Sequence, residues 1–227
     1  MTLGRPRLHL RAVGSTNERA KALAAAGAPH GTLVTADEQT TGRGRQGRVW
    51  TAPPGSSVLM SLILRDLDET HELLPLAAAV AVCEAIPVGA AIKWPNDVWI
   101  EQRKVAGILV EGRPQEGWAV LGVGVNVTTQ EFPPEIAAAA TSLHLAGIEV
   151  TRDGLLDDLV RSLSDWLGAP PDAVLAAWRS RDALMGERVR WSGGEGTASG
   201  IDDSGALLVQ TRNGPVTLDA GEVHLLP

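Results

Sequence analysis

The first part of the chain contains both short apolar runs and a longer alanine-lined stretch, which predicts strands mixed with helices. Short apolar runs bounded by glycine, proline and polar residues favour strands over residues 8–13, 31–38 and 56–65. A longer alanine-lined stretch, residues 69–86, favours a buried helix. The strands and helices follow one another closely, which is typical of an α/β or α+β domain.

A helix is also predicted directly after the first strand, from the sequence GSTNERAKALAAAGA. Ser15 is followed three residues later by Glu18, and this spacing fits a capping box at a helix start. Gly27 and Pro29 end the alanine-rich run behind it. Ser15 is therefore expected to cap this helix.

The middle of the chain is rich in strands, and two amphipathic helices follow it. Tight turns separate four apolar runs, which predicts an antiparallel meander over residues 91–95, 97–101, 104–112 and 117–127. Leucines recur at helical spacing further on, which predicts helices over residues 151–168 and 171–184.

The pattern changes again near residue 184. From Gly186 to the end, turn signals recur every six to ten residues between short apolar runs, which predicts a small β-barrel. We therefore expect two domains, residues 1–184 and residues 185–227.

Composition narrows the class of protein. The chain has 227 residues, of which 44% are hydrophobic, and it holds a single cysteine, so neither a disulfide framework nor a cysteine metal site is expected. No apolar run approaches the ~20 residues of a membrane span, and arginines interrupt the N-terminal segment where a signal peptide would be apolar. These features favour a cytoplasmic protein with no membrane partner. The formal net charge of −7 argues against non-specific coating of nucleic acid.

The segment TGRGRQGRVW, residues 41–50, runs against this negative balance. Its glycine spacing fits a dinucleotide-binding fingerprint, but the glycines follow polar residues and precede Pro53 and Pro54, so the strand and helix that this motif needs are not expected. It also lacks the lysine and hydroxyl of a P-loop. A plain solvated loop is one alternative. The other is a nucleotide or phosphoanhydride site, because guanidinium groups bind phosphate oxygens in pairs and glycines let a backbone approach a ligand.

Two further segments carry candidate chemistry. In KWPNDVWIEQRKVAGILVEG, residues 93–112, Lys104 opens an apolar strand, where a cation is costly unless it meets an anion, and Gly107 would let a ligand lie against the backbone. In LGVGVNV, residues 121–127, Gly122 and Asn126 interrupt an apolar strand. A simple hairpin and a bulged strand are the alternatives for these two segments.

Together the segments GSTNERA, EQTTGRGRQGRVW, KWPNDVWIEQRKVAGILVEG and LGVGVNV resemble the biotin protein ligases. The resemblance implies a class II synthetase-like catalytic domain, with a mixed sheet and flanking helices, and a small C-terminal SH3-like β-barrel. It also implies two half-reactions. Biotin and ATP form biotinyl-5′-AMP and pyrophosphate, and a lysine of a biotin carboxyl carrier protein then takes the biotinyl group.

The resemblance also implies site residues. Catalysis is expected from Arg43, Arg45 and Lys104. Biotin is expected to contact Ser15, Thr16, Asn17, Gln39, Gly42, Arg43, Gly44, Arg45, Lys104, Gly107 and Gly122. ATP is expected to contact Arg45, Arg48, Trp50, Lys104 and Asn126. Magnesium is expected with the ATP, and no motif identifies a protein ligand for it.

The resemblance raises the questions of whether the protein binds DNA and whether it forms a dimer. Some members carry an N-terminal winged-helix domain and repress biotin operons, but here the motifs begin by residue 14, so no DNA binding is expected. A homodimer is possible. The alternatives are a lipoate or octanoate ligase, which has a different arginine–glycine signature, and a non-enzymatic biotin-sensing or RNA-binding module.

Overall fold

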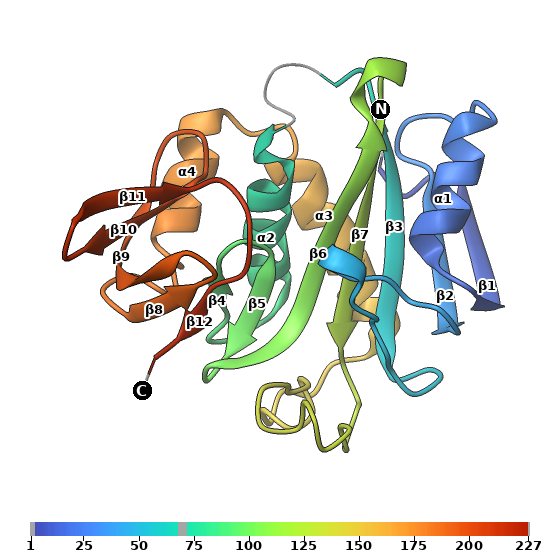
Figure 1. Ribbon diagram of the computed structural model, residues 1–227. Helices are drawn as coiled ribbons and strands as arrows, with labels where there is room; N and C mark the ends of the chain where they lie inside the picture. The colour runs from blue at the N-terminus through green and yellow to red at the C-terminus, as the bar shows by residue number, and fades with distance from the viewer. Residues whose placement is uncertain (1–2, 68–71, 227) are drawn as a thin grey trace.

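The large sheet of the protein is mixed and is built from strands that are far apart in sequence. The computed structural model describes residues 3–67 and 72–226 (Figure 1). The sheet has the strand order β1-β2-β3-β7-β6-β5-β4, in which β1 and β2 are parallel and every other pair is antiparallel. Its strands are β1 (Arg7–Val13), β2 (Leu33–Gln39), β3 (Ser57–Arg65), β4 (Ala91–Lys93), β5 (Asp97–Ile100), β6 (Arg103–Arg113) and β7 (Trp118–Asn126). The predicted meander is confirmed as β4-β5-β6-β7.

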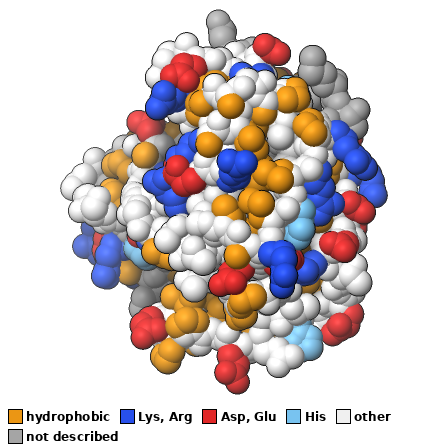
Figure 2. All heavy atoms as spheres, turned by 90° about the vertical axis from the view of Figure 1, so that its right-hand side faces the viewer, with side chains coloured by type: hydrophobic (Ala, Val, Ile, Leu, Met, Phe, Trp, Pro, Cys, Tyr) orange, Lys and Arg blue, Asp and Glu red, His pale blue; other side chains and the backbone are white. Residues whose placement is uncertain are grey.

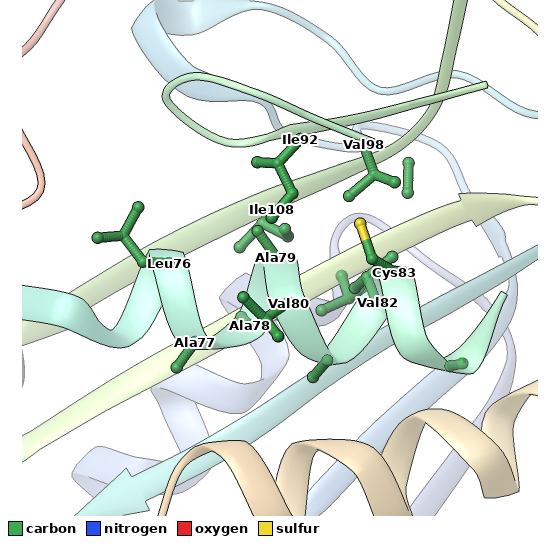
Figure 3. Close-up of a cluster of buried hydrophobic side chains, with 14 of the residues drawn as sticks. Leu76, Ala77, Ala78, Ala79, Val80, Val82, Cys83, Ile92, Val98 and Ile108 are labelled. Carbon is green, nitrogen blue, oxygen red and sulfur yellow. The ribbon is translucent and has the colours of Figure 1, made fainter. Parts of the chain in front are cut away.

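Helices cover both faces of this sheet. Helix α1 (Thr16–Ala25) packs on β2, β3 and β7, and helix α2 (Leu74–Ala85) packs on the opposite face, between the sheet and the helices α3 (Arg152–Trp166) and α4 (Pro171–Arg179). The first residues of the helix predicted over 69–86 lie outside the described residues. Alanines fill much of α2, and Figure 3 shows it lying close under Ile92, Val98 and Ile108. Small side chains permit this close approach of helix and strands.

The sequence placed the start of α1 correctly at Ser15, but the predicted capping box and the predicted end of the helix over 171–184 are wrong. Ser15 is the N-cap residue of α1, but its side chain makes no capping hydrogen bond, and Glu18 pairs with Lys21 and Arg43 instead of reaching back to the cap. The helix predicted over 171–184 ends at Arg179. Residues 181–183 run beside β4 instead, where Ile92 donates its backbone N–H to Arg181 and accepts from Ala183. An unpaired edge strand gains more from these bonds than the chain gains from another helical turn.

The C-terminal segment forms a second, antiparallel sheet of five strands in the order β11-β10-β9-β8-β12. These strands are β8 (Arg188–Trp191), β9 (Gly194–Ile201), β10 (Leu207–Thr211), β11 (Gly214–Leu218) and β12 (His224–Leu225). Val189, Leu207 and Val209 of this sheet belong to the same buried cluster as α2, so the two sheets share one apolar core. The predicted fold class, a mixed sheet with helices and a smaller β-module, is confirmed.

The outer face of α1 and β1 is charged with both signs. Figure 2 shows Lys and Arg side chains interspersed with Asp and Glu over this face, with apolar side chains between them. Among the described residues, no helix has the length and apolar character needed to cross a membrane.

Candidate active site

One cavity of about 400 Å³ lies on the α1 face of the large sheet and gathers the three segments that the sequence singled out. Figure 1 shows the loop between β2 and β3 crossing in front of β6 and β7. Residues 43–46 and 48–51 of this loop line one wall of the cavity. The floor is made by β6 and β7, and residues 221–224 of the C-terminal segment close one end. The predicted site residues that line it are Ser15, Thr16, Asn17, Gln39, Arg43, Gly44, Arg45, Arg48, Trp50, Lys104, Gly107, Gly122 and Asn126.

Gly42 is the predicted site residue that does not line this cavity. A Cβ there would overlap the Trp50 carbonyl oxygen and would lie 3.0 Å from Gln39 Nε2. The Trp50 N–H donates to the Gly42 carbonyl oxygen at 3.1 Å. Gly42 therefore lets the two ends of the loop pack together, and its contribution to the site is the shape of the loop.

The buried end of the cavity is polar, and hydrogen bonds fix which way its amides point. Gln39 Oε1 accepts from the backbone N–H of Thr16 at 2.7 Å and from its hydroxyl at 2.9 Å. Asn17 Oδ1 accepts from Ser61 Oγ at 2.6 Å. Both amide oxygens have protein donors, so Gln39 has its Nε2 free to donate to a ligand, and Asn17 Oδ1 keeps one lone pair.

Glycines occupy paired positions on the floor and make space there for the Trp50 ring. Gly107 of β6 lies opposite Gly124 of β7, and the Trp50 ring packs over both. A Cβ on Gly124 would lie 2.7 Å from Trp50 Cε2. Trp50 Nε1 is buried and has no hydrogen-bond partner among the described residues. Such a donor is costly to leave unsatisfied and is available to a ligand acceptor.

Cations gather around the middle of the cavity. Lys104 Nζ lies 2.7 Å from Asp97 Oδ1 and 5.6 Å from the centroid of the Trp50 ring. Lys93 Nζ lies 5.9 Å from the centroid of the Trp99 ring. Burial lowers the pKa of Lys93, since the charge of Asp97 only partly offsets burial and the nearby cations. Burial also lowers the pKa of Arg45. Each of these cations lines the cavity, where an anion would relieve the cost of their burial.

The other two loop arginines are engaged by carboxylates. Arg43 pairs with Glu18 of α1 and lies 3.7 Å from Glu111 Oε1. Arg48 pairs with Glu222, which belongs to the C-terminal segment. For the predicted contacts with biotin and the triphosphate, a ligand must displace these carboxylates or bind the arginines together with them.

Asn126 lines the cavity, but the protein already uses its side chain. Its Nδ2 donates to the Thr141 carbonyl oxygen at 3.0 Å, and its Oδ1 accepts from Ser57 Oγ at 3.4 Å. Its backbone carbonyl accepts from Leu143. In this structure Asn126 holds the segment after β7 against the cavity.

Several residues of the cavity were not identified from the sequence. Asp97 opens the strand predicted over 97–101 and had no predicted role, yet it is the partner of Lys104, whereas its neighbour Asn96 exchanges hydrogen bonds with Ile108. The spacing of Asp97 and Lys104 across a predicted hairpin was a usable signal for this pair. Other lining residues come from segments that gave no sequence signal for a site; among them are Phe132, Ile136, Ala139, Gly221, Glu222 and His224.

A metal site made of protein side chains is not evident. Among residues 3–67 and 72–226, no group of three His, Cys, Asp or Glu side chains is placed to hold a metal ion.

Comparisons with known proteins agree with this architecture. Residues 10–127 match the model of the Biotin/lipoate A/B protein ligase family, and residues 186–226 match the biotin protein ligase C-terminal domain. The bifunctional ligase/repressor BirA of Bacillus subtilis is 38% identical over 94% of this chain and 72% of that protein. The biotin–[acetyl-CoA-carboxylase] ligase of Mycobacterium tuberculosis is 37% identical over 93% of this chain and 86% of that protein.

A solved structure extends the agreement to three dimensions. The biotin protein ligase of Aquifex aeolicus in complex with biotin and ATP superposes with a TM-score of 0.86, at 29% identity, over 98% of this chain and 99% of that one. This chain therefore belongs to the Biotin/lipoate A/B protein ligase family and, within it, to the biotin protein ligases.

Proposed function

We propose that the cavity binds biotin and ATP side by side and carries out both half-reactions of a biotin–[acetyl-CoA-carboxylase] ligase. The observation that carries this proposal is the division of the cavity into a polar end with fixed amides and a cationic middle. The relative from Mycobacterium tuberculosis is a biotin–[acetyl-CoA-carboxylase] ligase by name, and the Aquifex aeolicus ligase binds biotin and ATP.

The polar end suits the ureido ring of biotin. A ureido group offers one carbonyl acceptor and two N–H donors, and Gln39 Nε2 and Asn17 Oδ1 offer the complementary donor and acceptor. Ser15 and Thr16 complete this end, and Gly122 leaves the space that the Asn17 amide occupies on the pocket wall. Lipoate has no group that would satisfy these amides, so the same end would discriminate against it.

The cationic middle suits the joining of two anions. A biotin carboxylate oxygen attacks the α-phosphorus of ATP, the bond from that phosphorus to the bridging oxygen breaks, and pyrophosphate leaves. The two anions repel each other, and Lys104 and Arg45 would neutralise the charge that builds up between them. Arg43 would support the carboxylate side. Arg48 would meet the triphosphate, and Trp50 and Asn126 would lie beside the adenylate.

The second half-reaction uses the same cations. The lysine amine of the carrier protein attacks the biotinyl carbonyl carbon, an amide forms, and AMP leaves with the electrons of the anhydride bond. Lys104 would stabilise the negative charge on the departing phosphate. Magnesium would arrive on the phosphates of ATP, which hold it well without a protein cage, and we assign no step to it.

The partners follow from this assignment. We expect a biotin carboxyl carrier protein or domain as the macromolecular substrate and action in the cytoplasm. A homodimer is compatible with the free edge strand β1.

The test is ATP–pyrophosphate exchange by the purified protein with biotin, with lipoate and with neither. Exchange that requires biotin is the expected result. Exchange with lipoate would move the substrate assignment to the other branch of the family, and no exchange with either acid would leave a binding module without adenylation chemistry.

A further inference from the structure

Glu111 is a carboxylate beside the polar end of the cavity, on the α1 face of the sheet, and it has no part in the proposed chemistry. It lies near the end of β6, its side chain is 21% exposed, and it does not line the cavity. We propose that Glu111 is a positioning residue, which fixes the direction of the Asn17 amide in the biotin pocket and links that amide to Arg43 of the loop. The proposal rests on the assignment of this pocket to biotin.

The direction of the Asn17 amide follows from what a carboxylate can do. Asn17 Nδ2 donates to Glu111 Oε2 at 2.9 Å and to the Leu109 carbonyl oxygen at 3.4 Å. An ionised carboxylate only accepts hydrogen bonds, so the nitrogen must face Glu111. Oδ1 therefore points the other way, toward Ser61 and the pocket.

The reversed amide would be unfavourable on both sides. Its oxygen would face the Glu111 carboxylate, and the Asn17 side chain is 4% exposed, so water would not separate the two acceptors. Its nitrogen would then face the pocket as a donor, where the N–H groups of a ureido ring need an acceptor. Glu111, with the weaker Leu109 contact and the Ser61 hydroxyl, thus favours the amide direction that suits biotin.

Glu111 is held in its ionised form by its neighbours. Burial opposes its charge, but hydrogen bonds from Asn17 and Lys21, together with the charges of Lys21 and Arg43, outweigh burial and lower the pKa of Glu111. Lys21 Nζ lies 3.1 Å from Glu111 Oε1. The lowered pKa favours the ionised form of Glu111, which only accepts hydrogen bonds.

The same carboxylate also reaches the arginine–glycine loop. Arg43 lies 3.7 Å from Glu111 Oε1 and pairs with Glu18 as well. The amide that meets the ureido ring and the arginine that anchors the loop therefore share one partner. If Asn17 and Arg43 are coupled through Glu111, the effects of substituting each on biotin affinity should not add in the double variant.

An inversion of donor and acceptor tests the proposal. Asn17→Asp places two carboxylates face to face, and we expect biotin affinity, measured without ATP by calorimetry, to fall by at least ~30-fold. Glu111→Gln alone keeps an oxygen that accepts from Asn17, and the loss should stay below ~10-fold. In the double variant the glutamine nitrogen donates to the new carboxylate, whose other oxygen still faces Ser61 and the pocket. The double variant should recover at least ~10-fold in biotin affinity over Asn17→Asp.

A matched control separates amide direction from simple relief of charge. Glu18→Gln removes a neighbouring negative charge, but Glu18 pairs with Lys21 and Arg43 and not with Asn17. Adding Glu18→Gln to Asn17→Asp should therefore not restore biotin affinity. The proposal would be overturned if Glu18→Gln and Glu111→Gln restored the biotin affinity of Asn17→Asp equally. It would also be overturned if Glu111→Gln restored none of it. If the double variant does not fold, the single variant Glu111→Leu decides, and it should weaken biotin at least ~10-fold while ATP affinity changes less than ~2-fold. A wild-type protein that binds no biotin would instead overturn the proposed function, and this inference with it.

Discussion

Lys104 and Asp97 face each other across the β5–β6 hairpin, with Nζ 2.7 Å from Oδ1, at the centre of the cavity. The carboxylate compensates the lysine charge and holds it in a cavity that Arg45 also lines. A cation that is oriented before the substrates arrive costs little reorganisation when the negative charge develops. This relationship leads to the first prediction.

Replacing Lys104 or Arg45 by alanine should remove adenylation without unfolding the protein. Each variant removes a cation next to the reacting carboxylate and phosphate, and we expect biotin-dependent pyrophosphate exchange to fall by at least ~100-fold. The melting temperature should stay close to that of the wild type. Arg113→Ala, which removes an arginine that is paired with Glu116 on the surface, is the matched control and should leave exchange unchanged. Near-normal exchange in either cavity variant would contradict the assigned roles.

Gly122→Ala should weaken biotin selectively. A Cβ at this position would overlap Asn17 Oδ1, so the amide would be pushed from its place on the pocket wall. We expect the KM for biotin to rise at least ~10-fold while the KM for ATP changes little. Gly168→Ala meets only ordinary van der Waals contacts and serves as the control. A parallel rise in both KM values would point to a general loss of structure instead.

Lys93 should give ATP binding a pH dependence of its own. Burial lowers its pKa below the ordinary 10.5, with Asp97 opposing burial and Lys104, Arg48 and Arg45 adding to it. As pH rises through this lowered pKa, the side chain loses its charge, and the KM for ATP should rise before the ordinary lysine range is reached.

The stability of the protein should change in the opposite sense over the same pH window. The unfolded state keeps its proton on Lys93 up to the ordinary pKa, so between the folded and unfolded values the free energy of unfolding that this group contributes increases with pH. Lys93→Met should remove both dependences, and Lys21→Met, a lysine outside the cavity, should remove neither. Identical pH profiles of KM in the wild type and Lys93→Met would contradict the prediction.

Gly205→Ala should loosen the contact between the two sheets. The Trp94 Nε1–H donates to the Gly205 carbonyl oxygen at 3.0 Å, and Gly205 has φ +87° with its Cβ position 2.5 Å from Leu76 Cδ1. Backbone strain and overlap together predict a loss of about 2 kcal/mol in the free energy of unfolding in urea. Gly214→Ala, at φ +113° with open space around it, controls for the backbone strain alone and should cost less. Equal losses in the two variants would show that the Leu76 contact does not contribute.

Much of the fold was predictable because its signals are local. The apolar face of each strand, the alanine-lined helix α2 and the turn-rich C-terminal segment appear directly in the sequence. The loop at residues 41–50 was identified for the same reason, since its arginines and glycines are adjacent in the chain.

The wrong helix ends and the missed site residues all depend on contacts between segments that are far apart in the sequence. Ser15 has the residue type of a cap, yet the cavity that it lines is completed by strands a hundred residues away. The helix after Pro171 stops early because β4 offers backbone partners to residues 181–183. Glu222 reaches Arg48 only because the C-terminal sheet packs against α2 in the same apolar core. Hydrophobic periodicity carries no information about such pairings.

The central claim is that one cavity binds the ureido ring at Asn17 and Gln39 and the phosphate at Lys104 and Arg45. A crystal structure of this protein with biotinyl-5′-AMP tests it most directly. The account predicts the ureido carbonyl within hydrogen-bond distance of Gln39 Nε2, a ureido N–H donating to Asn17 Oδ1, and the phosphate beside the two cations. A ureido ring bound elsewhere, or a phosphate out of reach of Lys104 and Arg45, would contradict it.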